Sequence, residues 1–241
     1  MSAADAVAAE LRKALTLPAT LAGLAVAVLG PVALAALNAS QGTADSAAEA
    51  ALAAEPLITI GAIVLGVIAV SSEYNGGRQI ASTFAAMPRR LTVLAAKAAA
   101  VAVLVAVAAA VAFPASLLVA RLVAGPGPGA DDVLGRAIGA GVYAVLIGLI
   151  ALAITVLTRS GIVPLIVLIA NGSVVSVSFL LYLVTPLARY LPDLAGMRML
   201  AGDDRIAIDD ALAPLPGGLV MAAWTAALLA VAGAVLVRRD A

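Results

Sequence analysis

Long stretches with little or no charge constrain the fold of this chain more than any other feature. A helix that spans a bilayer needs about 20 mainly apolar residues. Six stretches approach or exceed that length, with short polar segments between them: residues 18–37, 56–72, 94–119, 138–158, 162–187 and 216–237. Only 12% of the residues are charged, about half the share in a typical soluble domain. The sequence therefore predicts an all-α membrane protein whose six transmembrane helices form a single domain over residues 1–241.

The charges between the spans predict how the bundle is oriented. Six spans place both termini on one side, and the segments on that side hold nine Lys or Arg residues and four acidic residues. The segments on the opposite side hold five Arg and ten acidic residues. Because Lys and Arg accumulate in cytoplasmic segments, we expect both termini to lie in the cytoplasm.

Residues 1–17 precede the first span and have the pattern of an amphipathic helix. Val7, Leu11 and Leu15 recur at i, i+4 and i+8, and Ser2 with Asp5 can form a capping box. We expect a helix that lies in the inner membrane interface. A frayed polar tail is the alternative, because short helices are marginal in water.

The loop between the second and third predicted spans reads SSEYNGGRQIASTFAAMPRR over residues 71–90. Two glycines cost about 1 kcal/mol each inside a helix, so the second span should end near Gly76 and Gly77. Residues 78–87 can then form a short helix that Pro88 stops. Apolar side chains share one face of that helix: Ile80, Phe84 and Met87. This pattern alone fits either a helix that tethers the loop to lipid or one that docks onto another protein.

The residues around this loop resemble those of a known family. Glu73-Tyr74-x-x-Gly77, a short helix, and then Pro88-Arg89-Arg90 with Lys97 resemble the permease subunits of ABC transporters of the second type. In that family an E-x-x-x-G turn ends the second span and a P-x-R…K cluster opens the third. The layout agrees over the whole chain, whereas the motif covers residues 71–97. Here an arginine directly follows the proline, so either arginine is a candidate for contact with a partner or with lipid.

The resemblance implies that the loop holds a cytoplasmic coupling helix, which in that family docks onto a separate ATP-binding subunit. The residues that it assigns to coupling are Glu73, Gly77, Arg78, Gln79, Ile80, Phe84, Met87, Arg89 and Arg90. The resemblance also implies a transport subunit in a bacterial cytoplasmic (inner) membrane that exports an amphipathic or lipid-like substrate. ATP would be bound by the partner, which agrees with the missing Walker A motif, and the chain itself would hold no cofactor. A second copy or a sister permease would complete a dimer in the lipid bilayer, and no nucleic acid would take part.

Two further features concern the membrane interior. Lys97 lies in the first turns of the third span, where its amine can extend back toward the inner headgroups. In the fifth span Asn171, Ser178 and Tyr182 fall at i, i+7 and i+11 on one helix face. Polar groups there avoid lipid, so this stripe either lines a translocation path or forms hydrogen bonds between helices, worth about 0.6 kcal/mol each. Residues 188–215 then form the longest outer segment, with room for one or two short helices.

Composition excludes several classes of enzyme. The chain has no cysteine and no histidine, so thiol nucleophiles, Cys/His zinc sites and Ser-His arrangements are ruled out, and we expect no catalytic residue and no metal site. An ion-coupled secondary transporter is an alternative, although that class usually needs ionisable residues near mid-membrane, and the centres of the predicted spans have none. A non-transporting membrane partner protein is a further alternative.

Overall fold

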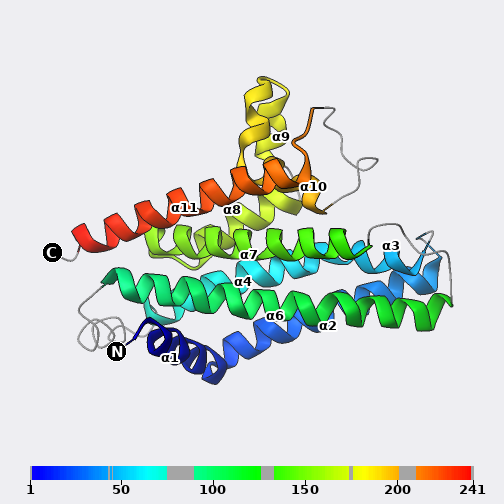
Figure 1. The fold of residues 1–241 in the computed structure, drawn as a ribbon, viewed down its shortest axis with the longest axis horizontal. Coiled ribbons are helices and arrows are strands. Elements are labelled where there is room, and N and C mark those ends of the chain that lie inside the picture. Colours follow the sequence, from blue (N-terminus) through cyan, green and yellow to red (C-terminus); the bar gives the residue numbers. More distant parts are fainter. Residues whose placement is uncertain are drawn as a thin grey trace.

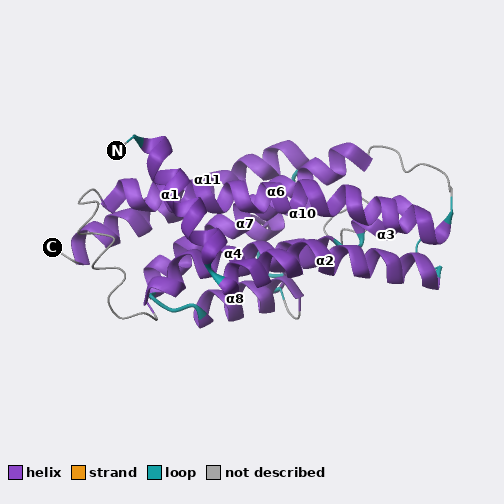
Figure 2. Ribbon diagram, turned by 90° about the horizontal axis from the view of Figure 1, so that it is seen from below, coloured by secondary structure: helices purple, strands orange, loops and turns teal. Residues whose placement is uncertain are grey.

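The computed structural model describes residues 2–42, 44, 46–74, 90–125, 133–173, 176–200 and 210–239. Every regular element in these ranges is a helix (Figure 2). Five helical segments there are long and apolar enough to cross a membrane. They are α2 (Pro18–Gln41), α3 (Ala47–Leu52) with α4 (Glu55–Tyr74), α6 (Arg90–Ala124), α7 (Val133–Thr158) and α11 (Pro214–Arg239). The chain is therefore an all-helical, multi-pass membrane protein over its described part, as the sequence predicts.

The long helices lie side by side along the long axis of the molecule (Figure 1). Helices α4, α6 and α7 contribute most of the core, including Ile58, Ile150 and Leu152, each no more than 2% exposed. The two helices approach closely where Gly66 faces Gly148, because a Cβ on Gly66 would lie 2.1 Å from the Gly148 carbonyl oxygen. Only a residue without a side chain permits this contact between the helices.

The helices are longer than the apolar stretches that predict them. Helix α6 has 35 residues, or about 52 Å at 1.5 Å per residue, whereas the hydrocarbon core of a bilayer is about 30 Å thick. Hydropathy shows which part of a helix is apolar. The helix itself continues beyond its apolar part wherever its backbone hydrogen bonds can form. The predicted boundaries therefore mark where each helix leaves the apolar part of the membrane and not where the helix ends.

The fifth predicted span, residues 162–187, is not one continuous helix, so that prediction is wrong. The structure has α8 (Ile162–Ser173), α9 (Val177–Tyr182) and a 3-10 helix, η1 (Pro186–Tyr190). Helix α8 has 12 residues, about 18 Å, and Figure 1 shows α9 projecting from the side of the bundle. The predicted short helix in the outer segment is present as α10 (Pro192–Leu200).

The divided segment begins beside the last turn of α4 and reaches the first part of α7. Just before α8, Gly161 lies against Ser71 in the last turn of α4, since a Cβ on Gly161 would be 3.0 Å from the Ser71 Cβ. At the far end of the segment, the Met199 carbonyl oxygen would be 2.7 Å from a Cβ on Gly139, near the start of α7. Within the described residues, five helical segments therefore run along the bundle, and the short pieces from α8 to α10 lie beside them.

Residues 3–16 form helix α1 (Ala3–Thr16), which confirms the predicted N-terminal helix. Its capping box is present: the Ser2 backbone N–H donates to Asp5 Oδ2 at 2.8 Å and the Asp5 N–H donates to Ser2 Oγ at 3.1 Å. The face that packs on the bundle carries Ala6 and Glu10, whereas Leu15 is 48% exposed. Val7 and Leu11 of the predicted apolar stripe are partly buried, so only its C-terminal part faces away from the protein.

Candidate functional site

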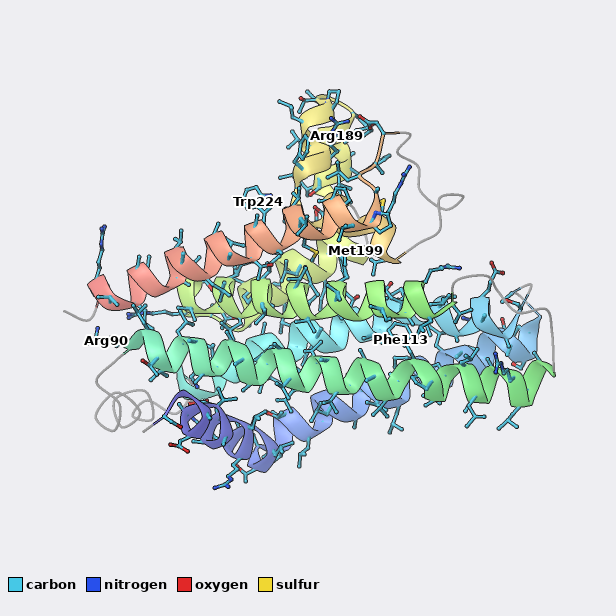
Figure 3. All side chains as sticks on the ribbon, viewed as in Figure 1. Arg90, Phe113, Arg189, Met199 and Trp224 are labelled. Carbon is cyan, nitrogen blue, oxygen red and sulfur yellow. The ribbon has the colours of Figure 1, made fainter. Side chains whose placement is uncertain are left out.

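One end of the bundle gathers the segments that flank the predicted coupling loop. Residues 75–89 lie outside the described residues, and with them every assigned coupling residue except Glu73 and Arg90. Glu73 is in the last turn of α4, and Arg90 is the first residue of α6. Arg90 NH1 donates to the Leu236 carbonyl oxygen of α11 at 3.2 Å. The start of α6 and the end of α11 therefore lie together, at the end where α1 begins (Figures 1 and 3).

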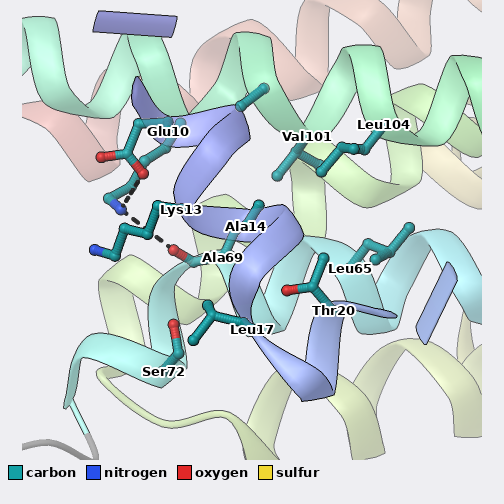
Figure 4. Close-up of a pocket in the computed structure, with 12 residues that line it drawn as sticks. Glu10, Lys13, Ala14, Leu17, Thr20, Leu65, Ala69, Ser72, Val101 and Leu104 are labelled. Atoms are coloured by element: carbon teal, nitrogen blue, oxygen red, sulfur yellow. Dashed lines mark hydrogen bonds and ion pairs between the residues drawn. The ribbon is translucent and has the colours of Figure 1, made fainter. Parts of the chain in front are cut away.

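Lys97 connects three helices at this same end. Its Nζ donates to Glu10 Oε2 of α1 at 2.8 Å and to the Ala69 carbonyl oxygen of α4 at 3.4 Å (Figure 4). The side chains of Lys97 and Glu10 are only 6% and 10% exposed. The lysine therefore faces protein, and the expectation that it extends toward the headgroups is wrong. A carboxylate from a distant part of the sequence supplies the partner that a buried amine requires.

A small cavity lies beside this ion pair. It measures about 20 Å³ and is bordered by Lys13, Leu17 and Thr20 from the N-terminal part of the chain and by Leu65 and Ser72 from α4 (Figure 4). A water molecule requires roughly 10–15 Å³ on the same measure. The cavity therefore has room for about one water molecule and is far too small for an amphipathic cargo.

A second group of polar contacts holds the divided segment between α8 and α10. Asn171 Nδ2 donates to Asp193 Oδ2 at 2.7 Å, and Ser176 Oγ donates to the same oxygen at 3.3 Å. The other side of the Asn171 amide accepts a bond from the Val177 backbone N–H at 2.8 Å. Asn171 therefore serves the backbone at the point where the helix is broken, which agrees with the hydrogen-bonding interpretation of this residue.

Further along, Tyr182 and Arg189 both bind Asp210. The Tyr182 hydroxyl donates to Asp210 Oδ1, and Arg189 NH1 donates to Oδ2 at 2.8 Å. The bond from Tyr182, together with the positive charge of Arg189, lowers the pKa of the Asp210 carboxyl. The guanidinium of Arg189 also lies 5.0 Å from the centre of the Tyr190 ring. These contacts tie η1 to the segment that leads into α11.

The predicted stripe in the fifth span does not form as one helix face. Asn171 belongs to α8, whereas Ser178 and Tyr182 belong to α9, and the helix is interrupted between them. Ser178 is partly buried, and its role in a translocation path stays a prediction.

Two buried polar residues escaped the sequence interpretation. Glu10 occupies the face of α1 that also carries Ala6 and Ala14 at i−4 and i+4, and such small neighbours allow another helix to approach, which is the signal that was missed. Glu55 is 8% exposed in the first turn of α4, where it accepts a hydrogen bond from the Thr59 hydroxyl. The partly positive N-terminus of a helix favours a carboxylate at that position.

An apolar groove of about 470 Å³ runs between α6 and α7. Ala109, Phe113 and Pro114 form the α6 side, and Ile138, Gly141 and Val142 contribute to the α7 side. All the side chains that line it are apolar, so the groove offers no group for acid–base or metal chemistry. It suits only an apolar ligand or lipid.

Within the described ranges, no group of three or more Asp and Glu side chains is placed to hold a metal ion. A scan against known protein families and searches among curated proteins and solved structures found no match to this chain. What the fold defines is the class: over its described part, a multi-pass helical membrane protein with a buried ion pair between Glu10 and Lys97 near one end and the short helices α8 to α10 beside the long ones.

Proposed function

We propose that this chain is the permease subunit of an ATP-driven ABC exporter and pairs with a separate ATP-binding subunit. The observation that carries the proposal is how the flanks of residues 75–89 are held. Lys97 bonds the start of α6 to Ala69 near the end of α4, and Arg90 bonds it to α11. A loop that transmits force from a partner requires both of its flanking helices to be fixed in the bundle, and these contacts supply that.

The path of the chain supports the six-span arrangement of the proposal. In this arrangement the short pieces from α8 to α10 form the fifth crossing, and both termini lie in the cytoplasm of a bacterial inner membrane. Irregular backbone is tolerated at membrane depth only where it is covered by protein or lines a water-filled cavity. The bonds from Asn171 and Ser176 to Asp193 are of the kind that such a broken span requires.

The proposed cargo is amphipathic or lipid-like. The α6–α7 groove supports an apolar ligand because its lining is apolar throughout. A second permease, either another copy or a sister chain, would complete the transporter, and the ATP would be bound by the partner subunits alone.

An ion-coupled secondary transporter is the second candidate, and the observation that favours it is Glu55. This carboxylate is almost fully buried in a helical segment able to span a membrane, and ionisable residues in such segments often mark ion pathways. Glu55→Gln should abolish ion-driven uptake or export in proteoliposomes if this candidate is right. If the exporter proposal is right, an imposed ion gradient should drive no transport in the wild type or the variant.

The test of the proposed function is co-purification of the ATP-binding subunit, identified by mass spectrometry, followed by substitutions at Phe84. Burying a phenylalanine side chain stabilises by roughly 1.5–3 kcal/mol. Phe84→Ala should therefore weaken association about 10- to 100-fold, since about 1.4 kcal/mol is a factor of ten. Phe84→Asp should weaken it further because the carboxylate would be desolvated without a partner.

Ser82→Asp is the matched control. It introduces the same charge into the same predicted helix, two residues away and off the apolar stripe. Pull-down of the ATP-binding subunit and permease-stimulated ATP hydrolysis should both fall for Phe84→Asp and change little for Ser82→Asp. Equal binding and stimulation by wild type and Phe84→Asp would contradict the assignment of this loop as the coupling element.

A further inference from the structure

Helix α1 is attached to the rest of the protein at its C-terminal end and along the face that packs on α6. At its C-terminal end, Leu17 has an extended backbone (φ −84°, ψ 121°) and is the single residue between α1 and α2, which begins at Pro18. Midway along α1, Glu10 reaches Lys97 of α6 at 2.8 Å. The helix is thus joined to α2 through one non-helical residue, and a buried ion pair lies within its packing against α6.

Lys97 also links α1 to both helices that flank residues 75–89. It lies on α6, which follows the loop, and it donates to Ala69 on α4, which precedes the loop. Glu10 is therefore connected through one amine to both flanks (Figure 4). A change in the relative position of α4 and α6 would alter one or both bonds of the Lys97 amine.

The burial of the pair makes this connection stiff. Removing one partner would leave the other charged group without compensation in a site with little solvent, which is strongly unfavourable. The buried ion pair between Glu10 and Lys97 therefore disfavours any arrangement in which α1 separates from α6 while both side chains stay charged. Helix α1 and the start of α6 should consequently move as one unit.

We propose that Glu10 and Lys97 are positioning residues that make α1 follow the coupling loop. In this inference, which rests on the proposed function, displacement of residues 75–89 by the ATP-binding subunit shifts the start of α6, and the ion pair carries that shift into α1 about the Leu17 hinge. The pair thus connects the state of the ATP-binding subunit to a helix that does not belong to the coupling loop.

The test uses the complex reconstituted in nanodiscs, with spin labels at Ala9→Cys on α1 and Leu91→Cys on α6. Both sites are exposed, and the native chain has no cysteine to compete. In the otherwise native protein the distance between the labels should stay narrow and unchanged when ADP and vanadate are added. With Glu10→Gln the distance distribution should broaden, and permease-stimulated ATP hydrolysis should fall by roughly fivefold or more, the usual range of coupling between sites.

Two double variants and one control variant separate coupling from folding. The charge swap Glu10→Lys with Lys97→Glu keeps an ion pair between α1 and α6 but loses the donation to the Ala69 carbonyl oxygen. It should therefore restore the narrow label distance, which a loss caused by misfolding would not do. Replacing the pair by Glu10→Leu with Lys97→Met should leave the fold intact, because apolar pairs replace buried ion pairs at little cost. Permease-stimulated ATP hydrolysis should nevertheless stay low, because both bonds of the Lys97 amine to α1 and α4 are lost. Arg12→Gln removes an exposed charge from the same helix and should change neither readout.

The outcomes distinguish this inference from the proposed function. The Glu10→Leu, Lys97→Met variant could bind the ATP-binding subunit and stimulate its ATP hydrolysis as fully as the wild type does. That result would overturn the positioning role and leave the proposed function standing. Failure of any ATP-binding subunit to bind the wild type would overturn the proposed function and this inference with it. A narrow label distance in Glu10→Gln would show that the ion pair does not hold α1 and would also overturn the inference.

Discussion

Replacing Gly66 by alanine tests the packing at the centre of the bundle. A Cβ at this position would lie 2.1 Å from the Gly148 carbonyl oxygen and 3.2 Å from the Ala151 Cβ, whereas ordinary contacts begin at 3.4 Å. The close atom belongs to the backbone, so no side-chain rotation can relieve the clash. Helices α4 and α7 must separate, and the contacts on both sides of Gly66 are lost with that movement.

The expected cost of Gly66→Ala follows from comparison with Gly141→Ala in α7. A Cβ on Gly141 would meet only the Ala109 Cβ at 3.8 Å, so Gly141→Ala has the same gain in helix propensity without a clash. The difference between the two variants is then the overpacking term, about 1–3 kcal/mol. For a chain of this size each kcal/mol shifts the melting temperature by roughly 2–4 °C.

The assay is thermal unfolding of both variants and the wild type in the same detergent or nanodisc. Gly66→Ala should melt several degrees below Gly141→Ala. If the two variants melt at the same temperature, α4 and α7 are not in backbone contact at Gly66, and the arrangement of the central helices is wrong.

Three other predictions address the topology and the divided segment. A cysteine placed at Ser46 should react with an impermeant thiol reagent from outside intact cells, whereas one at Ser82 should react only after permeabilisation; labelling of Ser82→Cys in intact cells would reverse the proposed orientation. Because the folded state lowers the pKa of Asp210, the stabilisation from its bonds to Tyr182 and Arg189 is present above the unfolded pKa of about 3.9 and is lost as pH falls through the folded value. The single tryptophan, Trp224, donates to the Tyr190 carbonyl oxygen at 2.8 Å, so its fluorescence should change in that acid range in the wild type and not in Asp210→Asn. Ser178→Leu should impair transport without loss of membrane insertion or partner binding if Ser178 lines the path; loss of the protein from the membrane would instead indicate a structural role.

Hydrophobic patterning was sufficient to predict the long helices. The apolar stretches at 18–37, 94–119, 138–158 and 216–237 each lie within one observed helix, α2, α6, α7 and α11. Each is too long and too apolar to be anything else in a bilayer, because every backbone group there needs a partner within the helix. The capping box at Ser2 was equally predictable, since it depends on two residues three positions apart.

The break in the fifth span could not be predicted by the same means. Residues 162–187 are as apolar as the other spans, and hydropathy is blind to local bonds between side chains and backbone. Asn171 accepts from the Val177 N–H, and Ser176 Oγ accepts from the Phe179 N–H at the start of α9. Asn and Ser side chains compete with the helix for backbone groups in this way, but whether they do so depends on a third residue, Asp193, which lies well beyond the apolar stretch.

The ion pair between Glu10 and Lys97 was hidden for a different reason. The two residues are 87 positions apart, and nothing in a single sequence shows that α1 packs on α6. Each residue taken alone is typical of a membrane interface, where charged groups normally reach water. Only the three-dimensional arrangement converts two apparent surface charges into one buried contact.

These features divide the molecule into parts that resist movement and parts that permit it. Helices α4 and α7 are in backbone contact at Gly66 and Gly148, and a close-packed contact of this kind has one favourable separation. Helix α1, by contrast, is joined to α2 through Leu17, and α9 is a separate short helix with its own N-cap at Ser176. A movement imposed at the end that carries Arg90 and Lys97 would therefore leave the α4–α7 contact intact. It would be taken up by α1 and by the divided segment, which is where the experiments on Glu10 and Ser178 look for it.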